Sequence, residues 1–193
     1  MLLYLSPRFY EWSITRLRGP ELHRRFAKIA EVVGEGSVLD VACGTGLLAG
    51  YLSDGARYSG IDLNRRFLKF SRKKGLDVAE HDVFDVDGYP EADTYVLCDL
   101  LHHVMPHHQD LLESVLSLGK TVVVCEPPEP SKSKLRRFLI RGILDNDGIN
   151  PPRLDQTWFT EPELLDFFER VMAPDEMVKI GGDVIAVRRP AEA

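Results

Sequence analysis

Short apolar runs alternate with longer amphipathic stretches along most of this chain. Each short run is rich in Val, Ile, Thr and Tyr, a composition typical of β-strands. The longer stretches carry apolar residues at helical spacing, most clearly Leu111, Leu112, Val115 and Leu116. The expected strands are residues 37–41, 58–61, 77–80, 94–98 and 121–125, and the expected helices between them are residues 46–53, 65–74 and 109–118. This alternation predicts βαβ units and a parallel sheet covered by helices.

The beginning of the chain predicts a helical cap over residues 1–33. Residues 1–19 form a capping segment that contains several aromatic side chains, and residues 21–33 have the apolar spacing of an amphipathic helix. The cap therefore precedes the first expected strand and does not belong to the βαβ alternation.

The end of the chain breaks the alternation. Thr160 and Glu163 form a capping box for a helix expected to end near residue 171. Two expected strands, residues 176–180 and 183–188, flank a Gly-Gly pair and predict a hairpin. We expect one α/β domain over residues 1–193, with a parallel sheet that finishes in an antiparallel hairpin.

Composition narrows the class of protein. The chain has 193 residues, 44% of them hydrophobic, and a formal net charge of -6 from 24 basic and 30 acidic residues. This length and composition suit one globular domain, and the acidic balance argues against a nucleic-acid-binding surface over the whole protein. Three cysteines suit a reducing compartment, and the apolar runs are too short to cross a bilayer. With no leader pattern at Met1–Trp12, a cytoplasmic location is expected.

Candidate ligand-binding residues follow the expected strands. Gly44 and Gly46 come after the first strand, and Asp62, Asp82 and Asp99 follow the next three. Ligands of open parallel sheets bind beyond the carboxyl ends of the strands, and a small-residue turn there lets a ligand approach the backbone. An acid at the second strand end, 18 residues after Gly44, can accept hydrogen bonds from ribose hydroxyls.

The glycine turn alone leaves alternatives open. It can be a tight strand-to-helix turn without a ligand, and Gly44 to Ala49 also fits the G-x-G-x-x-A pattern of dinucleotide-binding proteins. Three features favour another ligand over NAD: Asp40 lies inside the turn, no sequence remains for a second substrate domain, and the terminal hairpin departs from the dinucleotide fold.

The segment Val38-Leu-Asp-Val-Ala-Cys-Gly-Thr-Gly46 resembles motif I of the class I S-adenosylmethionine-dependent methyltransferases. The similarity extends through Gly60-Ile-Asp62-Leu-Asn, His81-Asp82-Val83 and Leu101-His-His-Val104, roughly residues 33 to 118. Among small single-domain members it is closest in type to the ubiquinone and menaquinone methyltransferases. The resemblance implies a Rossmann-like, doubly wound α/β fold with a seven-stranded, mostly parallel sheet of order 3-2-1-4-5-7-6.

The resemblance also implies which residues bind S-adenosylmethionine. The glycine turn would lie along the methionine part, Asp40 would hold the ammonium group, and the backbone around Asp99 would line the same end. Asp62 would bind the ribose hydroxyls and Leu63 the adenine ring. Asp82 would accept from the adenine amino group, with the Val83 amide on a ring nitrogen. The implied cofactor-binding residues are Asp40, Ala42, Cys43, Gly44, Gly46, Asp62, Leu63, Asp82, Val83 and Asp99. Ala42 stands where many members have glycine.

Histidines after the fourth strand are candidate catalysts. His102 and His103 lie at the appropriate end of the sheet for a general base, with His107, His108 and Glu126 as further candidates. The Leu-His-His-Val segment can also simply begin a helix. The run Asp99-x-x-His102-His103 is similar to the Glu-x-x-Glu-His run of metal-assisted O-methyltransferases, but one acid is replaced, so no metal is expected. The cysteines Cys43, Cys98 and Cys125 are expected to be small packing residues.

Two basic runs stand out against the acidic balance. Residues 65–74 hold six basic residues and are expected to form a solvated helix face. Residues 132–144 combine basic and apolar side chains within a segment, 131–158, that resembles the family's lid-like insertion over the substrate. This second run can contact an anionic substrate or a membrane surface, or it can pack on the core as a cap helix.

These patterns predict an enzyme that transfers a methyl group from S-adenosylmethionine to a small-molecule acceptor, either apolar or anionic. The acceptor atom, O, N or C, and the oligomeric state are left open. Tyr4, Tyr10, Trp12, Trp158 and Phe159 are candidates for an apolar acceptor pocket. The alternatives are a non-catalytic binding module of the same fold and an NAD-dependent oxidoreductase.

Overall fold

A computed structural model describes residues 6–129 and 159–191. Seven strands form one sheet of order β3-β2-β1-β4-β5-β7-β6, which confirms the predicted order. The neighbours from β3 to β5 are parallel, while β7 runs antiparallel to both β5 and β6. The strands are β1 (Ser37–Val41), β2 (Arg57–Asp62), β3 (Val78–Glu80), β4 (Thr94–Cys98), β5 (Thr121–Glu126), β6 (Glu176–Ile180) and β7 (Asp183–Arg188).

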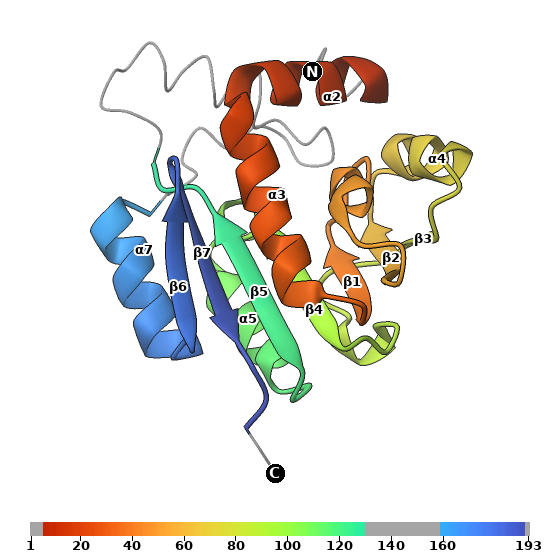
Figure 1. The fold of residues 1–193 in the computed structure, drawn as a ribbon. Helices are drawn as coiled ribbons and strands as arrows, with labels where there is room; N and C mark the ends of the chain where they lie inside the picture. Colours follow the sequence, from red (N-terminus) through yellow and green to blue (C-terminus); the bar gives the residue numbers. More distant parts are fainter. Residues whose placement is uncertain (1–5, 130–158, 192–193) are drawn as a thin grey trace.

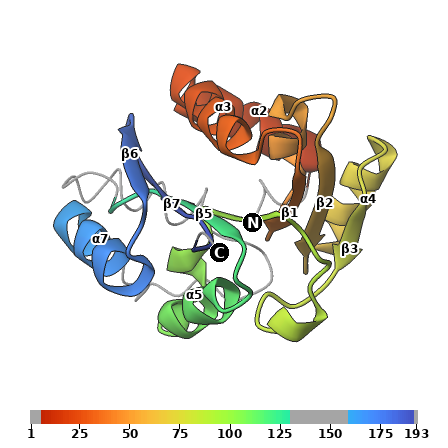
Figure 2. The same ribbon diagram turned by 60° about the horizontal axis from the view of Figure 1, so that its bottom comes forward.

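Helices cover both faces of the sheet (Figures 1 and 2). One face carries α3 (Pro20–Val33), the 3-10 helix η1 (Leu47–Tyr51) and α4 (Arg65–Lys73). The other face carries α5 (His108–Leu116) and α7 (Glu161–Phe167), which continues into the π-helical turn η5 (Phe168–Met172). Short 3-10 turns η2 (Val86–Gly88) and η3 (Leu101–His103) connect β3 to β4 and β4 to α5.

The central strands are apolar on both faces because each face packs on helices. Val38, Val96 and Val123 join one buried cluster with Leu22, Phe26 and Ile29 of α3. Their neighbours in sequence, among them Leu39, Leu97 and Val124, point to the opposite face and pack with α5 and α7. This alternation has the period of two residues that a strand imposes on its side chains.

Two predicted elements differ in detail. Residues 46–53 were expected to form a helix; the helix is shorter than expected, Leu47–Tyr51, and it is a 3-10 helix. Gly46, in a left-handed conformation, and the extended Leu52 bound this segment, which leaves too few residues to propagate an α-helix. The helix expected to end near residue 171 changes to a π-helical turn at Phe168.

The N-terminal segment forms a second helix, α2 (Pro7–Arg18), which turns into α3 at Gly19. The predicted cap is therefore helical from Pro7 onward. In Figure 1, α2 lies across the upper end of the sheet, where the parallel strands β1, β4 and β5 end. The helix thus covers the edge at which the sequence places the ligand-binding residues. No helix among the described residues is long and apolar enough to cross a membrane.

Candidate active site at the carboxyl edge of the sheet

The turn after β1 has the backbone shape that a close ligand requires. Ala42 adopts φ 61°, Gly44 φ 55° and Gly46 φ 70°, all in the left-handed region that favours glycine. A Cβ on Gly46 would lie 2.5 Å from Cδ1 of Leu76, and the positive φ would strain any residue with a side chain, so glycine is favoured there. Ala42 accepts the same backbone conformation with a methyl group in place of glycine's hydrogen. The turn stays free of large side chains at the sheet edge.

Asp62, the last residue of β2, is tied to this turn. Its Oδ2 accepts a hydrogen bond from the Gly44 amide at 2.8 Å, and its Oδ1 accepts one from the Asn64 amide at 2.6 Å. The two backbone bonds fix the orientation of the carboxylate. Because each carboxylate oxygen can accept more than one hydrogen bond, Asp62 is also able to receive a pair of neighbouring hydroxyl groups.

Asp40 in β1 is a buried acid beside this carboxylate. Its side chain is on the same face of the sheet as Tyr58, whose hydroxyl donates a hydrogen bond to Oδ2 at 2.9 Å. Burial, together with the charge of Asp62, raises the pKa of Asp40 to about 7, against the opposing effect of the Tyr58 hydrogen bond. A cationic group placed near Asp40 would relieve this cost, as the predicted ammonium contact requires.

The ends of β2 and β3 expose an apolar surface beside two acids. Leu63 is 41% exposed and Phe84 is 48% exposed, so both side chains offer apolar surface to a ligand. Asp82 accepts a hydrogen bond from the Phe84 amide at 3.0 Å, while Val83 is buried. Apolar faces next to hydrogen-bonding groups suit a planar heterocycle such as adenine.

Thr45 provides a separate test of whether the glycine turn fits a ligand. Its hydroxyl is buried and, among the described residues, finds no hydrogen-bond partner. Buried hydroxyls are normally satisfied, so an orphaned one in this turn fits a site completed by a polar ligand. The residues from Asp40 to Asp82 therefore fit S-adenosylmethionine in hydrogen-bonding capacity.

Asp99 has a role that the sequence did not indicate. The residue follows β4 with φ 55°, and its amide donates to the Cys125 carbonyl. Its carboxylate bridges two arginines from the N-terminal helices: Oδ1 lies 3.0 Å from Arg18 Nη2, and Oδ2 lies 2.7 Å from Arg25 Nη2. Burial opposes ionisation of Asp99, but the two guanidinium groups outweigh it and hold its pKa well below the usual range. Sequence analysis predicted only backbone contacts here.

Asp183 at the start of β7 completes this ion-pair network. Arg18 Nη1 lies 2.7 Å from Asp183 Oδ2, and Arg25 Nη1 lies 3.2 Å from the same oxygen. Arg25 and Asp183 are buried, at 2% and 7% side-chain exposure, whereas Arg18 and Asp99 are partly exposed. In the sequence, a sign of this network is the position of Arg25 between Leu22 and Ile29, on the apolar face of its helix. Its partners lie 74 and 158 residues away, beyond any local pattern.

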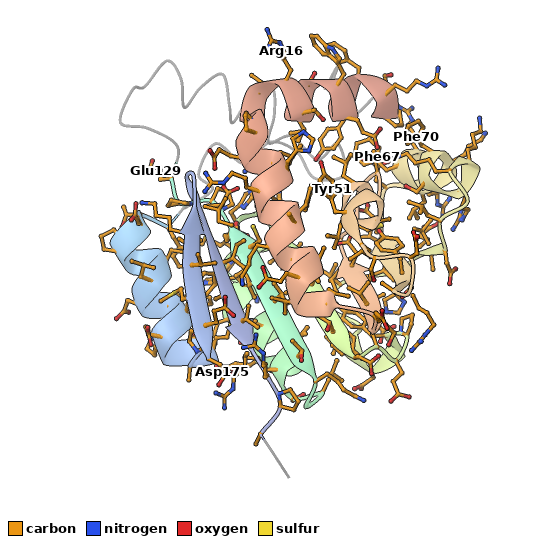
Figure 3. All side chains as sticks on the ribbon, in the orientation of Figure 1. Arg16, Tyr51, Phe67, Phe70, Glu129 and Asp175 are labelled. Carbon is orange, nitrogen blue, oxygen red and sulfur yellow. The ribbon has the colours of Figure 1, made fainter. Side chains whose placement is uncertain are left out.

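Helix α2 is also attached to the glycine turn. The ring of Tyr10 packs on Phe67 of α4 at 5.0 Å between centroids, and Phe67 in turn lies against Gly44. Lys74 pairs with Glu11 and donates a hydrogen bond to the Thr45 carbonyl at 3.0 Å. Burial and the charge of Asp99 raise the pKa of Tyr10, so its phenol is protonated at neutral pH. Figure 3 shows Phe67 and Phe70 between α2 and the rest of α4.

His102 and His103 lie in the turn η3 directly after β4. Glu126, the fully buried last residue of β5, accepts hydrogen bonds from the amides of Leu100, Leu101 and His102 and pairs with His102 Nδ1. A carboxylate on Nδ1 fixes the orientation of the imidazole ring and leaves Nε2 as its basic nitrogen. The His103 ring lies 4.1 Å from that of His102 and is less buried.

The other candidate bases are placed differently. His108 packs against Phe159 and Phe167, at 5.2 and 5.0 Å between ring centroids, and burial lowers its pKa. His107 is exposed beside Asp110. Glu126 is engaged by backbone amides, so its role is to position η3 and His102.

The cysteines and the histidine run do not form a ligand set. Cys98 and Cys125 are neighbours in the parallel β4/β5 ladder, and all three cysteines are free thiols. Cys43 packs instead with Leu68 and Val78. Within residues 6–129 and 159–191, no group of three or more His, Cys, Asp or Glu side chains converges as a metal site would require. The predicted segment 131–158, its basic run 132–144, Tyr4 and Trp158 lie outside the described residues.

Comparison with known families gives one match, to a family model described as a methyltransferase domain, over residues 38–121. This match contains the glycine turn, Asp62, Asp82, Asp99 and the His102-His103 pair. The predicted resemblance to class I methyltransferases is therefore confirmed; the ubiquinone-type subclass stays a prediction. No curated protein sequence matches the chain.

Solved structures share the fold at low sequence identity. PigF with SAH gives a TM-score of 0.69 at 18% identity, over 97% of this chain and 61% of that one. The 16S rRNA methyltransferase RmtF, in complex with S-adenosyl-L-homocysteine, gives 0.62 at 20% identity, over 92% of this chain and 65% of that one. A SAM-dependent methyltransferase from Thermotoga maritima, described as a possible histamine N-methyltransferase, gives 0.62 at 16% identity, over 96% and 97%. These likenesses confirm the predicted Rossmann-like methyltransferase fold.

Proposed function

We propose that this methyltransferase domain binds S-adenosylmethionine along the carboxyl edge of β1 to β4 and transfers its methyl group to a small-molecule acceptor. When bound, the cofactor supplies an electrophilic methyl group on a sulfonium. The chain's own residues then have to orient the cofactor, exclude water and accept a proton where the acceptor loses one.

The pairing of Asp62 with the Gly44 amide carries the proposal. The Gly44 amide donates a hydrogen bond to Asp62 Oδ2 at 2.8 Å. This bond brings the glycine turn after β1 and the acid at the end of β2 together in one candidate binding surface. Asp40 lies on the same side of the sheet, while Leu63 and Phe84 expose apolar surface beyond Asp62. The solved relatives named above include complexes with S-adenosyl-L-homocysteine, which supports this ligand for the chain.

Calorimetric titration with S-adenosylhomocysteine tests the proposal. We expect saturable binding that falls at least about 100-fold in Asp62→Ala, because the variant removes the carboxylate that would bind both ribose hydroxyls. Asp54→Ala is the matched control, since Asp54 is exposed and lies in the turn before β2. Absence of binding at millimolar ligand, or equal binding by both variants, would contradict the proposal.

For an acceptor that must lose a proton, we propose that His103 accepts it. The Glu126–His102 pair fixes the first imidazole, and the less buried His103 ring packs on it at 4.1 Å. His102 is then a positioning residue. Turnover with hydroxyl, phenol and carboxylate acceptors measures this role: His103→Asn is expected to lose about 100-fold or more in kcat with unchanged S-adenosylhomocysteine affinity. His107→Asn is the control, and equal turnover by both variants would refute the assignment.

The acceptor itself is proposed only at the level of a small molecule. One solved relative, an O-methyltransferase from Planctomyces limnophilus, was crystallised in complex with apigenin, and it shares the fold at a TM-score of 0.60 and 16% identity. Phe159, which stacks on Phe167 at 5.0 Å, and Tyr10 supply aromatic surface on either side of the site. A planar, apolar acceptor fits this surface.

A further inference from the structure

The outer surfaces of α2 and α4 carry unpaired positive charge. Arg65 pairs with Glu80, Lys74 pairs with Glu11, and Arg72 donates to the Val78 carbonyl. The remaining basic side chains of the two helices outside the Asp99 network are exposed and have no carboxylate partner among the described residues. These are Arg8, Arg16, Arg66, Lys69 and Lys73. Neither helix has an acidic residue in its first turn, so no local carboxylate there neutralises this surface.

Aromatic side chains are exposed on the same surface. Phe9 is 47% exposed and Trp12 is 61% exposed, and their rings stack at 5.7 Å between centroids. Arg8, Phe9, Trp12 and Arg16 fall on one face of α2, because residues three or four apart share a helix face. Figure 3 shows Arg16 pointing away from the body of the protein on this outer face. Aromatic residues flanked by arginines on one exposed helix face need a partner that offers both apolar and anionic groups.

A hollow between the two helices continues this surface. It has a volume of about 440 Å³ and is lined by Arg8, Phe70, Lys73 and Lys74. The Lys74 ammonium lies over the Phe70 ring at 4.7 Å, so the lining combines one aromatic ring with three basic side chains. Such a hollow suits an anionic headgroup whose apolar portion continues onto Phe9 and Trp12.

We infer that α2 and α4 form a docking surface, defined by Arg8, Phe9, Trp12, Arg16, Lys69 and Lys73, for an anionic lipid membrane. Charge complementarity selects this partner, because the surface is basic while the whole chain carries a net charge of -6. An anionic bilayer therefore attracts this surface, while the net negative charge of the whole chain disfavours non-specific adsorption. Trp and Phe with flanking arginines are the side chains that enter a membrane interface.

Two other partners fit less well. The Phe9 and Trp12 rings already stack on each other with an interplanar angle of 19°, so one face of each ring is unavailable to nucleic-acid bases. A second copy of the chain would place the same cations opposite one another. An anionic lipid surface offers negative headgroups to the basic side chains and an apolar interior to Phe9 and Trp12.

Vesicle sedimentation tests the inference with the full chain. We expect binding to vesicles of phosphatidylcholine with phosphatidylglycerol, little binding to phosphatidylcholine alone, and loss of binding as salt is raised. Lys69→Glu with Lys73→Glu should lower the affinity for the mixed vesicles by about tenfold or more. Arg57→Glu is the matched control for Lys69→Glu alone, because each variant reverses one exposed cation and Arg57 lies at the opposite, amino edge of the sheet.

Trp12 gives a second, independent readout. Trp158→Phe leaves Trp12 as the single tryptophan of the chain. Its fluorescence should shift to the blue with mixed vesicles, and Phe9→Ser should weaken vesicle binding without changing S-adenosylhomocysteine affinity. Equal binding to neutral and anionic vesicles, or charge reversals that bind like the wild type, would overturn the inference. Binding of RNA without binding of vesicles would also overturn the inference, as would a dimer that buries Trp12. The same variants are also titrated with S-adenosylhomocysteine in the absence of vesicles. This titration distinguishes failure of the membrane-docking inference from failure of the proposed cofactor binding.

Discussion

Burial of Asp40 disfavours the ionised form of its carboxyl group. Its folded-state pKa of about 7 is above the ordinary value of 3.8, so the folded protein holds this proton more tightly than the unfolded chain does. The stability associated with that proton is complete below pH about 4 and is lost as the pH rises through 7. Ionised Asp40 is therefore a cost that a cationic ligand group would offset.

Asp40→Asn makes this cost measurable. In urea unfolding, the free energy of unfolding of the variant should rise relative to that of the wild type as the pH increases from about 4 to about 7. The relative gain should reach about 4 kcal/mol, because the pKa of Asp40 differs by about three units between the folded and unfolded states. The same variant should bind S-adenosylhomocysteine more weakly at pH 8, because it lacks the charge for the ammonium group. Asp54→Asn serves as the exposed control. A stability difference that does not change with pH would rule out a raised pKa.

Gly60 of β2 packs closely against the glycine turn that follows β1. A Cβ at this position would lie 2.8 Å from both Cβ and Sγ of Cys43 and 2.9 Å from the Tyr58 hydroxyl. Gly60→Ala is expected to destabilise the protein by about 1–3 kcal/mol in urea unfolding, since neither neighbour can move without disturbing Asp40. Gly50→Ala is the control, because a Cβ there meets nothing within 4 Å. Similar unfolding midpoints for the two variants would contradict this packing.

At the scale of the elements, the N-terminal helices are joined to the sheet by charge. Arg25 of α3 pairs with both Asp99 and Asp183, and Arg18 of α2 does the same. Arg25→Met is expected to cost about 1.5–3 kcal/mol in urea unfolding, because it removes the buried guanidinium that pairs with Asp183 and Asp99, while Arg18 still compensates their charge. The neighbouring Arg24, 65% exposed and paired with Glu21, provides the control: Arg24→Met should change stability by less than about 1 kcal/mol. Equal effects would show that the network contributes no more than a surface pair.

The sequence was informative wherever local pattern determines structure. Alternating apolar runs predicted every strand of the sheet, and the Gly-Gly pair predicted the β6–β7 hairpin, because these depend on side-chain period and turn chemistry. The family resemblance predicted the strand order, which the structure confirms, and the site residues at the carboxyl edge, which stay a prediction. The η1 helix was predicted too long because a single turn bounded by Gly46 and Leu52 has the same apolar spacing as a longer helix.

The parts that sequence could not predict depend on contacts distant in the chain. Asp99 and Arg25 are 74 residues apart, and Glu126 lies 24 residues from His102. Nothing in the spacing of these residues indicates that they meet. Each pairing follows only from strand order, which brings the ends of β4, β5 and β7 together beneath α2 and α3.

At the scale of the whole molecule, charge is divided between two regions. The acids Asp40, Asp62 and Asp82 lie along the carboxyl edge of the sheet, the proposed cofactor site, while the exposed surface of α2 and α4 is basic. Helix α2 contacts both regions, through Tyr10 and Arg18 toward the site and through Phe9 and Trp12 toward solvent. The proposed function concerns the first region, and the docking surface concerns the second.

The measurement that tests the central claim most directly is a crystal structure of the chain with S-adenosylhomocysteine. The account predicts ribose hydroxyls on Asp62, adenine against Leu63 with its amino group at Asp82, and the amino-acid end beside Asp40 and the backbone at Asp99. Ligand density elsewhere on the protein, or a carboxyl edge that stays without ligand at saturating concentration, would contradict it.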